Sequence, residues 1–149
     1  MPRFSHEQIL PYTPDQLFDL AADIESYPEF LPWCKGAKIL ARESEKILIA
    51  ELVINFKAFI ERYTSRVTLD RAALEITVEL VQGPFKHLYN GWKFTSVREG
   101  VRVEFDIDFE LRSALLQAVA TPAFNKAYQQ MIDAFANRAQ KIYKAKTSL

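Results

Sequence analysis

The sequence predicts an α+β domain in which a curved antiparallel sheet wraps around a long C-terminal helix. The spacing of apolar residues carries this prediction. It is helical in a short segment near the N-terminus and again over 122–146, whereas between about 38 and 111 it alternates with a period of two. Because an apolar helix stripe and an apolar sheet face must each be covered, we expect the long helix to lie on the concave face of the sheet.

Length and composition predict one domain, 1–149. Apolar residues make up 49% of the 149 residues, which is enough for one hydrophobic core. No Pro/Gly/Ser-rich linker and no internal repeat divides the sequence. This composition is typical of a globular protein and argues against a disordered or disulfide-stapled chain.

Three helix-start signals coincide at residues 13–16. Thr13 suits the N-cap, Pro14 suits the first helical position, and Gln16 completes a capping box. Apolar residues then recur at helical spacing at positions 17, 18, 21 and 24. We expect this short helix to end before Tyr27-Pro28, because the residue before a proline avoids helical geometry.

The segment 101–111 shows the clearest strand pattern. Its apolar positions are Val101, Val103, Phe105, Ile107, Phe109 and Leu111. Its intervening positions are Arg102, Glu104, Asp106, Asp108 and Glu110. Alternation therefore puts the four carboxylates on the face opposite the apolar one, and we interpret them as a solvated strand face rather than an acid/base or cation site.

Two further segments, 59–69 and 72–81, predict a hairpin. If Asp70-Arg71 forms a two-residue turn, paired residue numbers sum to about 141, and Arg66 faces Glu75. The same register pairs Arg62 with Glu79 and places the apolar side chains of both strands on the inner face.

The last third predicts a helix from Pro122 to about Lys146. Its apolar stripe consists of Phe124, Tyr128, Met131, Phe135 and Ile142. The cations Arg138, Lys141, Lys144 and Lys146 fall in its closing turns, where they favour the negative end of the helix dipole.

Charge and targeting signals predict a cytoplasmic protein. Nineteen Lys+Arg balance nineteen Asp+Glu, which excludes the overall basic field of a protein held mainly by nucleic-acid phosphates. The N-terminus has no secretory or transit pattern, and the longest uncharged stretch, 113–125, is too short and too polar to span a bilayer. Any membrane contact is therefore expected to be peripheral.

The residues that carry common catalytic chemistry are sparse, and we expect no enzyme and no metal site. His6 and His87 are the only histidines, and no phosphate-cradling, nucleophile-elbow or metal-ligand motif is present. Cys34 is either a nucleophile with a distant histidine or a packed thiol beside Trp33. Asn90, in a mostly apolar strand, either orients a ligand group or bonds to the backbone; the same holds for Asn55.

The apolar residues of the sheet and the last helix either fill the interior or line a cavity, and composition leaves both readings open. A cavity would suit a long apolar ligand, because each buried methylene contributes about 0.8 kcal/mol. The candidate lining residues are Phe59, Tyr63, Val67, Ile76, Val78, Trp92, Phe94, Phe105, Ile107, Phe109, Phe124, Tyr128, Met131 and Phe135.

The segment Tyr27-Pro28-Glu29-Phe30-Leu31-Pro32-Trp33-Cys34 resembles the signature of the coenzyme Q-binding branch of the START-like, or polyketide cyclase/dehydrase-like, superfamily. The resemblance continues through 63–67, 83–88, 92–94 and 109–113 and covers nearly the whole chain. It implies a helix-grip fold with a hydrophobic tunnel that binds ubiquinone or a related polyprenyl lipid.

The resemblance also implies a role. The family is taken to act as a carrier or chaperone that supports respiration and quinone biosynthesis, which makes quinone-handling enzymes and the inner membrane surface the expected partners. No catalytic cofactor and no DNA partner are expected. Bacterial members of the same branch include ribosome-association toxins that bind the large ribosomal subunit and block subunit joining, and this is the alternative function.

Two segments are candidates for contact with the ligand or a membrane. Leu115, Leu116 and Val119 lie between the last strand and the long helix, where they form either a membrane-facing lid or a packed helical turn. In the signature, Phe30, Leu31 and Trp33 either cap one end of the tunnel or contact a partner; the structural alternative is that Trp33 plugs the core.

Overall fold

The computed structural model describes residues 3–56 and 59–143, except for the side chains of residues 56, 59, 119, 120 and 123. It contains seven strands, two α-helices and one 3-10 helix. The elements are, in order, β1 (Arg3–Leu10), α1 (Pro14–Ala22), η1 (Ile24–Glu29), β2 (Cys34–Arg42), β3 (Ile47–Phe56), β4 (Phe59–Asp70), β5 (Glu75–Gln82), β6 (Phe85–Val97), β7 (Gly100–Leu111) and α2 (Ala114–Ile142).

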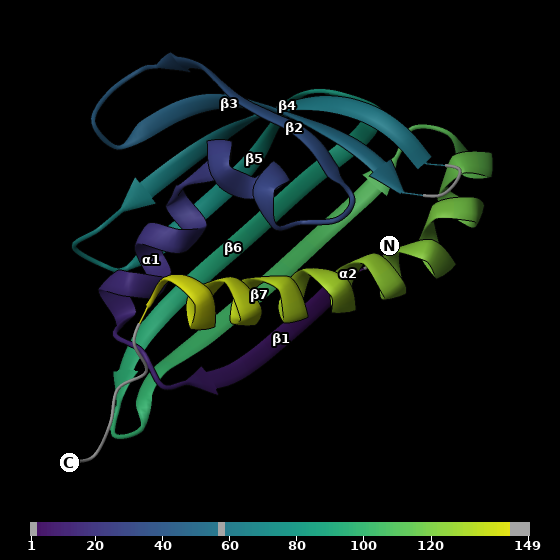
Figure 1. The fold of residues 1–149 in the computed structure, drawn as a ribbon. Coiled ribbons are helices and arrows are strands. Elements are labelled where there is room, and N and C mark those ends of the chain that lie inside the picture. Colours follow the sequence, from purple (N-terminus) through teal and green to yellow (C-terminus); the bar gives the residue numbers. More distant parts are fainter. Residues whose placement is uncertain (1–2, 57–58, 144–149) are drawn as a thin grey trace.

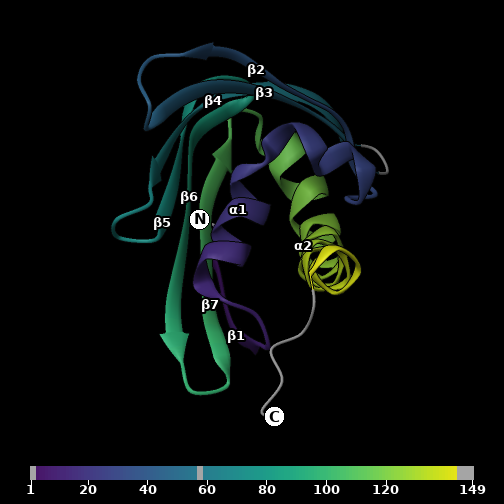
Figure 2. The ribbon, with the colours of Figure 1, turned by 60° about the vertical axis from the view of Figure 1, so that its left-hand side comes forward.

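All seven strands form one antiparallel sheet in the order β1-β7-β6-β5-β4-β3-β2. The sheet curves around the helices, and α1, η1 and α2 lie on its concave side (Figures 1 and 2). This arrangement confirms the predicted α+β helix-grip fold. Strand β1 was not anticipated; it pairs with β7 from Arg3↔Asp108 to Leu10↔Val101 and forms one edge of the sheet.

The predicted start of α1 is confirmed, and so is its end before Tyr27. Thr13 Oγ1 accepts a hydrogen bond from Gln16 N, and Gln16 Oε1 accepts one from Thr13 N, so the capping box is complete. The helix ends at Ala22, earlier than the proline alone required. The 3-10 helix η1 then carries the chain through Tyr27 and Pro28.

The register predicted for the β4–β5 hairpin is wrong. Asp70 pairs with Glu75 and Arg66 with Glu79, so paired numbers sum to 145 rather than 141. The physical reason is the length of the turn, which spans the four residues 71–74 rather than two. Leu74 adopts a φ of 56° in it, and Asp70 Oδ1 accepts a hydrogen bond from Ala73 N. Because the error is an even number of residues, every side chain keeps its predicted face.

The charge partners proposed for this hairpin change with the register. Arg66 forms an ion pair with Glu43 at 3.3 Å, and Arg62 forms one with Glu51 at 3.8 Å. Both acidic partners lie on the β2–β3 side of β4 rather than on β5, so charge pairing gave no information about the β4–β5 register.

Helix α2 begins eight residues before the predicted start, at Ala114, and Pro122 lies inside it. Ser113 is its N-cap and accepts a hydrogen bond from Leu116 N at 3.2 Å. Around the proline, Thr121 Oγ1 donates to Gln117 O at 2.7 Å, while Gln117 Oε1 accepts from Leu111 N at 2.8 Å. The bond from Leu111 ties the first turn to β7, and Leu115 and Leu116 belong to the helix and not to a connection. Residues 144–146 of the predicted helix lie outside the described residues.

The inner face of α2 packs on the sheet through Tyr128, Ile132, Phe135 and Ala139, all of which are buried. Ile142, which we placed on the same stripe, is 46% exposed because it lies in the last turn of the helix. No helix among the described residues is long and apolar enough to cross a membrane.

Candidate functional site

A cavity of about 80 Å³ lies between the concave face of the sheet and the helices. Strands β3 to β6 supply one side, and α1, η1, the segment after η1 and α2 supply the other. Its lining residues are Ala21, Ile24, Tyr27, Trp33, Ala50, Leu52, Tyr63, Ser65, Val67, Ile76, Val78, Asn90, Trp92 and Phe135. A second space of about 30 Å³ lies toward β1 and is lined in part by Phe105, Met131 and Ile132.

The predicted lining residues divide into two groups. Seven of them surround the larger cavity: Trp33, Tyr63, Val67, Ile76, Val78, Trp92 and Phe135. The others for which the structure describes a side chain pack beside it. Phe94 stacks on Trp92, Leu31 is buried, and Ile107, Phe109, Phe124 and Tyr128 form aromatic and aliphatic contacts toward the start of α2. The side chains of Phe59 and Val119 lie outside the described residues.

The interior space is small for a lipid site. Pockets that hold small molecules typically enclose about 300–1,000 Å³, several times the volume found here. Aromatic rings fill the intervening space: Trp92 lies 4.7 Å from Phe105 and 5.0 Å from Phe135 between ring centroids. Among the residues that the structure describes, these two interior cavities are small and lie on either side of Trp92 and Phe135.

Polar groups line the larger cavity, and two of them, Tyr63 and Asn90, were among the candidates named from the sequence. Ser65 is 1% exposed, and Tyr63 lies beside it on the inner face of β4. Burial raises the pKa of both Tyr27 and Tyr63, so both phenols stay protonated. Asn90 Nδ2 donates to Asp106 O at 2.8 Å, which is the backbone bond that we considered, and its side chain also lines the cavity. Asn55 is exposed.

The signature segment fastens α2 to the sheet. Trp33 Nε1 donates a hydrogen bond to Ala127 O at 3.1 Å. The ring of Phe30 meets Phe135 edge-on at 5.1 Å, and the Arg138 guanidinium lies 5.2 Å above the Phe30 ring. Arg138 also pairs with Glu29 at 3.1 Å. Trp33 thus forms one wall of the cavity and also holds the long helix.

Cys34 is a packed thiol. It is 1% exposed, and its Sγ atom donates to Gly36 O at 3.4 Å. Burial raises the pKa of the thiol, which works against the thiolate that a nucleophile needs. The packed alternative for Cys34 therefore fits the structure.

The two described residues of the predicted lid differ in their surroundings. Leu115 is 76% exposed, whereas Leu116 packs against the buried cluster of Phe85, Leu88, Phe109 and Leu111. Only Leu115 is positioned to touch a surface outside the protein.

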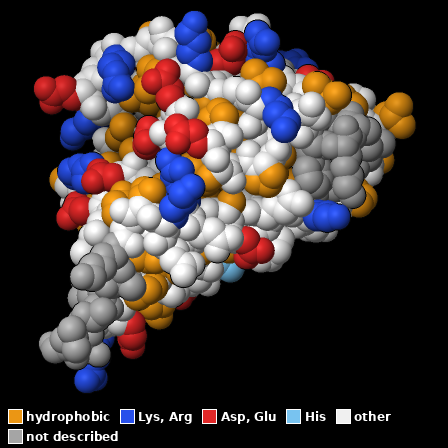
Figure 3. Space-filling view, viewed as in Figure 1, with side chains coloured by type: hydrophobic (Ala, Val, Ile, Leu, Met, Phe, Trp, Pro, Cys, Tyr) orange, Lys and Arg blue, Asp and Glu red, His pale blue; other side chains and the backbone are white. Residues whose placement is uncertain are grey.

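Exposed cations line the edge strand β2. Lys35, Lys38 and Arg42 are all exposed, and in the described part of the chain none of them lies within 4.0 Å of a carboxylate. Lys and Arg side chains lie along the upper edge of the molecule in Figure 3, over strands β2 to β4, with Asp and Glu side chains among them.

Comparison with known proteins places most of this chain in one family. Residues 10–136 match the family model described as polyketide cyclase/dehydrase and lipid transport. The chain is 40% identical to the ribosome association toxin RatA of Rickettsia prowazekii, over 97% of this chain and 100% of that protein. It is 29% identical to the mitochondrial coenzyme Q-binding protein COQ10 homolog B of Xenopus laevis, over 94% of this chain and 59% of that protein.

Solved structures show the same fold. The 18 kDa protein CC1736 of Caulobacter crescentus is 39% identical, with a TM-score of 0.80, over 95% of this chain and 98% of that one. The Zhui aromatase/cyclase of a Streptomyces species has a TM-score of 0.85 at 17% identity, over 99% of both chains. The second likeness concerns the fold alone, because one fold serves many activities.

Proposed function

Because the chain belongs to the polyketide cyclase/dehydrase and lipid transport family, and because relatives named ribosome association toxins match it along nearly its whole length, we propose that it binds the large ribosomal subunit and hinders subunit joining. The observation that carries this proposal is the 40% identity to the R. prowazekii protein. RatA and COQ10 are not names of enzymes, and the proposed role is one of binding.

The exposed cations of β2 are the proposed contact with ribosomal RNA. Lys35, Lys38 and Arg42 occupy an edge strand, so they can approach a phosphate backbone without rearrangement of the fold. The net charge of zero means that attraction must come from such a local group. Binding should then weaken steeply with salt, since each neutralised phosphate releases counterions.

We expect the triple variant Lys35→Glu/Lys38→Glu/Arg42→Glu to lose at least about tenfold in affinity for large subunits, because three phosphate contacts become repulsions. The measurement is cosedimentation with purified large subunits at several salt concentrations. The matched control is Lys93→Glu/Arg98→Glu/Lys141→Glu, which reverses three exposed cations elsewhere.

Two results would contradict the proposal at different levels. If both triple variants lose the same affinity for large subunits, β2 is not the contact. Absence of the wild-type protein from the subunit pellet at low salt would remove the ribosome as the partner.

A second candidate is the binding of ubiquinone or a related polyprenyl lipid by a membrane-peripheral carrier that supports respiration and quinone biosynthesis. The observation that favours it is the mixed lining of the 80 Å³ cavity. The hydroxyls of Tyr63 and Ser65 can donate to the carbonyl oxygens of a quinone ring, and Trp33 and Trp92 offer apolar walls. The cavity must widen to admit such a ligand, so its aromatic wall, which includes Trp33, Trp92 and Phe135, has to move.

In this second candidate, Leu115, the exposed residue of the predicted lid, is the membrane contact at the inner membrane surface. We expect Leu115→Ser to reduce quinone uptake from liposomes about threefold or more, because burying an exposed leucine side chain contributes about 1.5–3 kcal/mol. Protein incubated with ubiquinone-containing liposomes is re-isolated, extracted and analysed by mass spectrometry. Leu115 is exposed, so the substitution leaves the core intact.

The matched control is Ile142→Ser, which removes an exposed apolar side chain from the opposite end of α2. Equal uptake by wild type and Leu115→Ser would reject the lid, and no quinone in the wild-type extract would reject the carrier.

A further inference from the structure

The two edges of the sheet, β1 and β2, differ in their protection against the addition of a further strand. Along β2 the register with β3 shifts twice, and Lys35 and Lys38 are exposed. The 3-10 helix η1 also covers part of this edge, where Ile39 N donates a hydrogen bond to Glu25 Oε2 at 3.0 Å. Bulges, lysines and a covering segment are the devices by which proteins block an edge strand. Edge β2 is therefore blocked.

Edge β1 carries no bulge, no lysine and no proline over its described residues 3–10. Its register with β7 runs through all eight residues without a shift. Its contacts with α2 come from inward-facing side chains; the Phe4 ring, for example, lies 4.6 Å from the Phe124 ring between centroids. In the described chain, no backbone group outside β7 forms a hydrogen bond with the backbone of this strand. The outer edge of β1 therefore offers a regular row of N–H and C=O groups to another strand.

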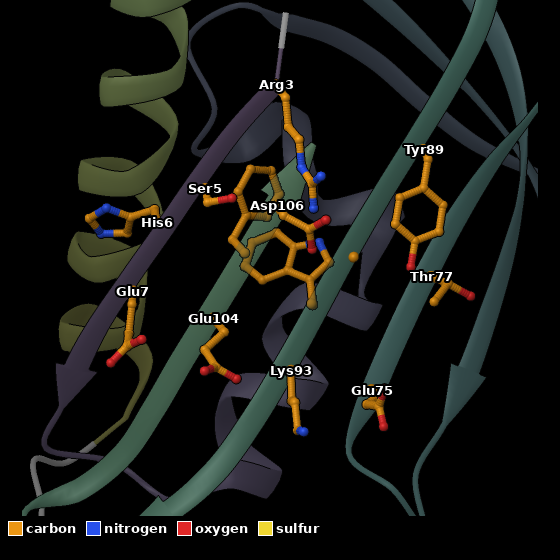
Figure 4. A pocket seen from close by; sticks show the side chains of 13 residues that line it. Arg3, Ser5, His6, Glu7, Glu75, Thr77, Tyr89, Lys93, Glu104 and Asp106 are labelled. Carbon is orange, nitrogen blue, oxygen red and sulfur yellow. The ribbon is translucent and has the colours of Figure 1, made fainter. Parts of the chain in front are cut away.

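The convex side of β1 carries opposite charges at equal distances from Ser5. Arg3, Ser5 and Glu7 alternate with the inward residues and are all exposed (Figure 4). Among the residues that the structure describes, Arg3 has no carboxylate within 4.0 Å. Glu7 pairs with Arg102 at 3.5 Å, and its side chain remains 61% exposed. Both charges are thus accessible to a neighbour at the edge.

These charges complement those of a second copy of the same strand. In an antiparallel pair centred on Ser5, Arg3 of each copy faces Glu7 of the other. On the concave side, the same register pairs Phe4 with His6. A centre at Glu7 would place two carboxylates together, and a centre at Phe4 or His6 would pair neither charge with its opposite. Charge complementarity therefore selects the register centred on Ser5.

We propose that β1 is a homodimer interface, at which two copies of this chain join their sheets edge to edge with Arg3 of each facing Glu7 of the other. Backbone hydrogen bonds supply attraction along the edge, and the two ion pairs fix the register. The paired segment is short and its ion pairs are exposed, so the association is reversible and weakened by salt. Both β2 edges lie at the far ends of the joined sheet, so the interface does not depend on the ribosome or quinone proposals.

The test is sedimentation velocity of the full chain over a wide range of protein concentrations at low ionic strength. We expect the mean sedimentation coefficient to rise from that of a monomer to that of a dimer, and to fall again when salt is added. A monomer at every concentration would overturn the proposal. So would assemblies larger than a dimer, because a two-fold interface closes on itself.

Charge reversal tests the register. Arg3→Glu brings four carboxylates together at the interface, and Glu7→Arg brings four guanidinium groups together, so each variant alone should lose at least about tenfold in association constant. An equimolar mixture of the two variants should associate again, because each Glu of one chain then faces an Arg of the other. A mixture that stays monomeric would overturn the proposed pairing, as would single variants that associate like wild type.

The matched control is Arg98→Glu, which reverses an exposed cation in the turn between β6 and β7. Its association constant should equal that of wild type, because the turn lies outside the paired segment. A loss in Arg98→Glu as large as that in Arg3→Glu would mean that association follows net charge and not the β1 register, and the proposal would fail.

Discussion

Gly100→Ala is expected to destabilise the protein by at least about 3 kcal/mol, from backbone strain combined with a backbone clash. Gly100 begins β7 with a φ of +146°, a conformation that L side chains rarely adopt. A β-carbon there would lie 2.2 Å from Leu10 O and 3.0 Å from Tyr12 N. Both are backbone atoms, and the pairing of Leu10 with Val101 fixes the first of them, so the clash cannot be relieved by a rotamer change.

The free energy of unfolding, measured by denaturant titration, tests this expectation. Gly36→Ala is the control: its nearest atom is Val53 Cγ2 at 3.4 Å, and its φ lies outside the range that side chains avoid. That variant should be neutral or more stable by about 0.5–1 kcal/mol, the usual advantage of alanine over glycine in a regular element. Equal stability of the two variants would contradict the expectation. It would show that the backbone after β1 can move away from Gly100 at little cost in free energy.

The sequence predicted the start of α1 and the inward face of β7, because each depends on residues close together in the chain. The capping box at Thr13 and Gln16 forms as the sequence indicates, because both bonds join residues three apart. The alternation over 101–111 places Phe105 and Phe109 inside because one side of β7 faces the helices. Pro122 misled the prediction of the start of α2, because a proline suits a first turn and side-chain bonds also permit it in the interior.

The candidate sites depend on register, and register was the weak point of the sequence prediction. The polar lining of the cavity by Ser65 and Asn90 requires that β4, β5 and β6 be aligned correctly. In that alignment Val67, Val78 and Asn90 fall in one row across the three strands. A turn longer by two residues moves such rows without changing the face of any side chain, so the alternation that predicts burial says nothing about them.

Phe135→Ala is expected to cost about 3–5 kcal/mol, the usual range for removing a buried phenylalanine. Phe135 is 6% exposed, and its ring lies within 5.6 Å, between centroids, of Tyr27, Phe30 and Trp92. It therefore joins α2 both to the signature segment and to the sheet. Thermal unfolding should show a fall in Tm of about 10 °C for a chain of this length.

Ile142→Ala is the matched control on the same helix, because the sequence placed Ile142 on the same stripe as Phe135 while the structure leaves it 46% exposed. We expect its stability to stay within about 0.5 kcal/mol of wild type, as for other surface substitutions. A large loss in Ile142→Ala would mean that the last turn of α2 is buried in solution. A small loss in Phe135→Ala would mean that the interior collapses onto the vacated space, and therefore that the wall around Trp33 can move as the quinone proposal requires.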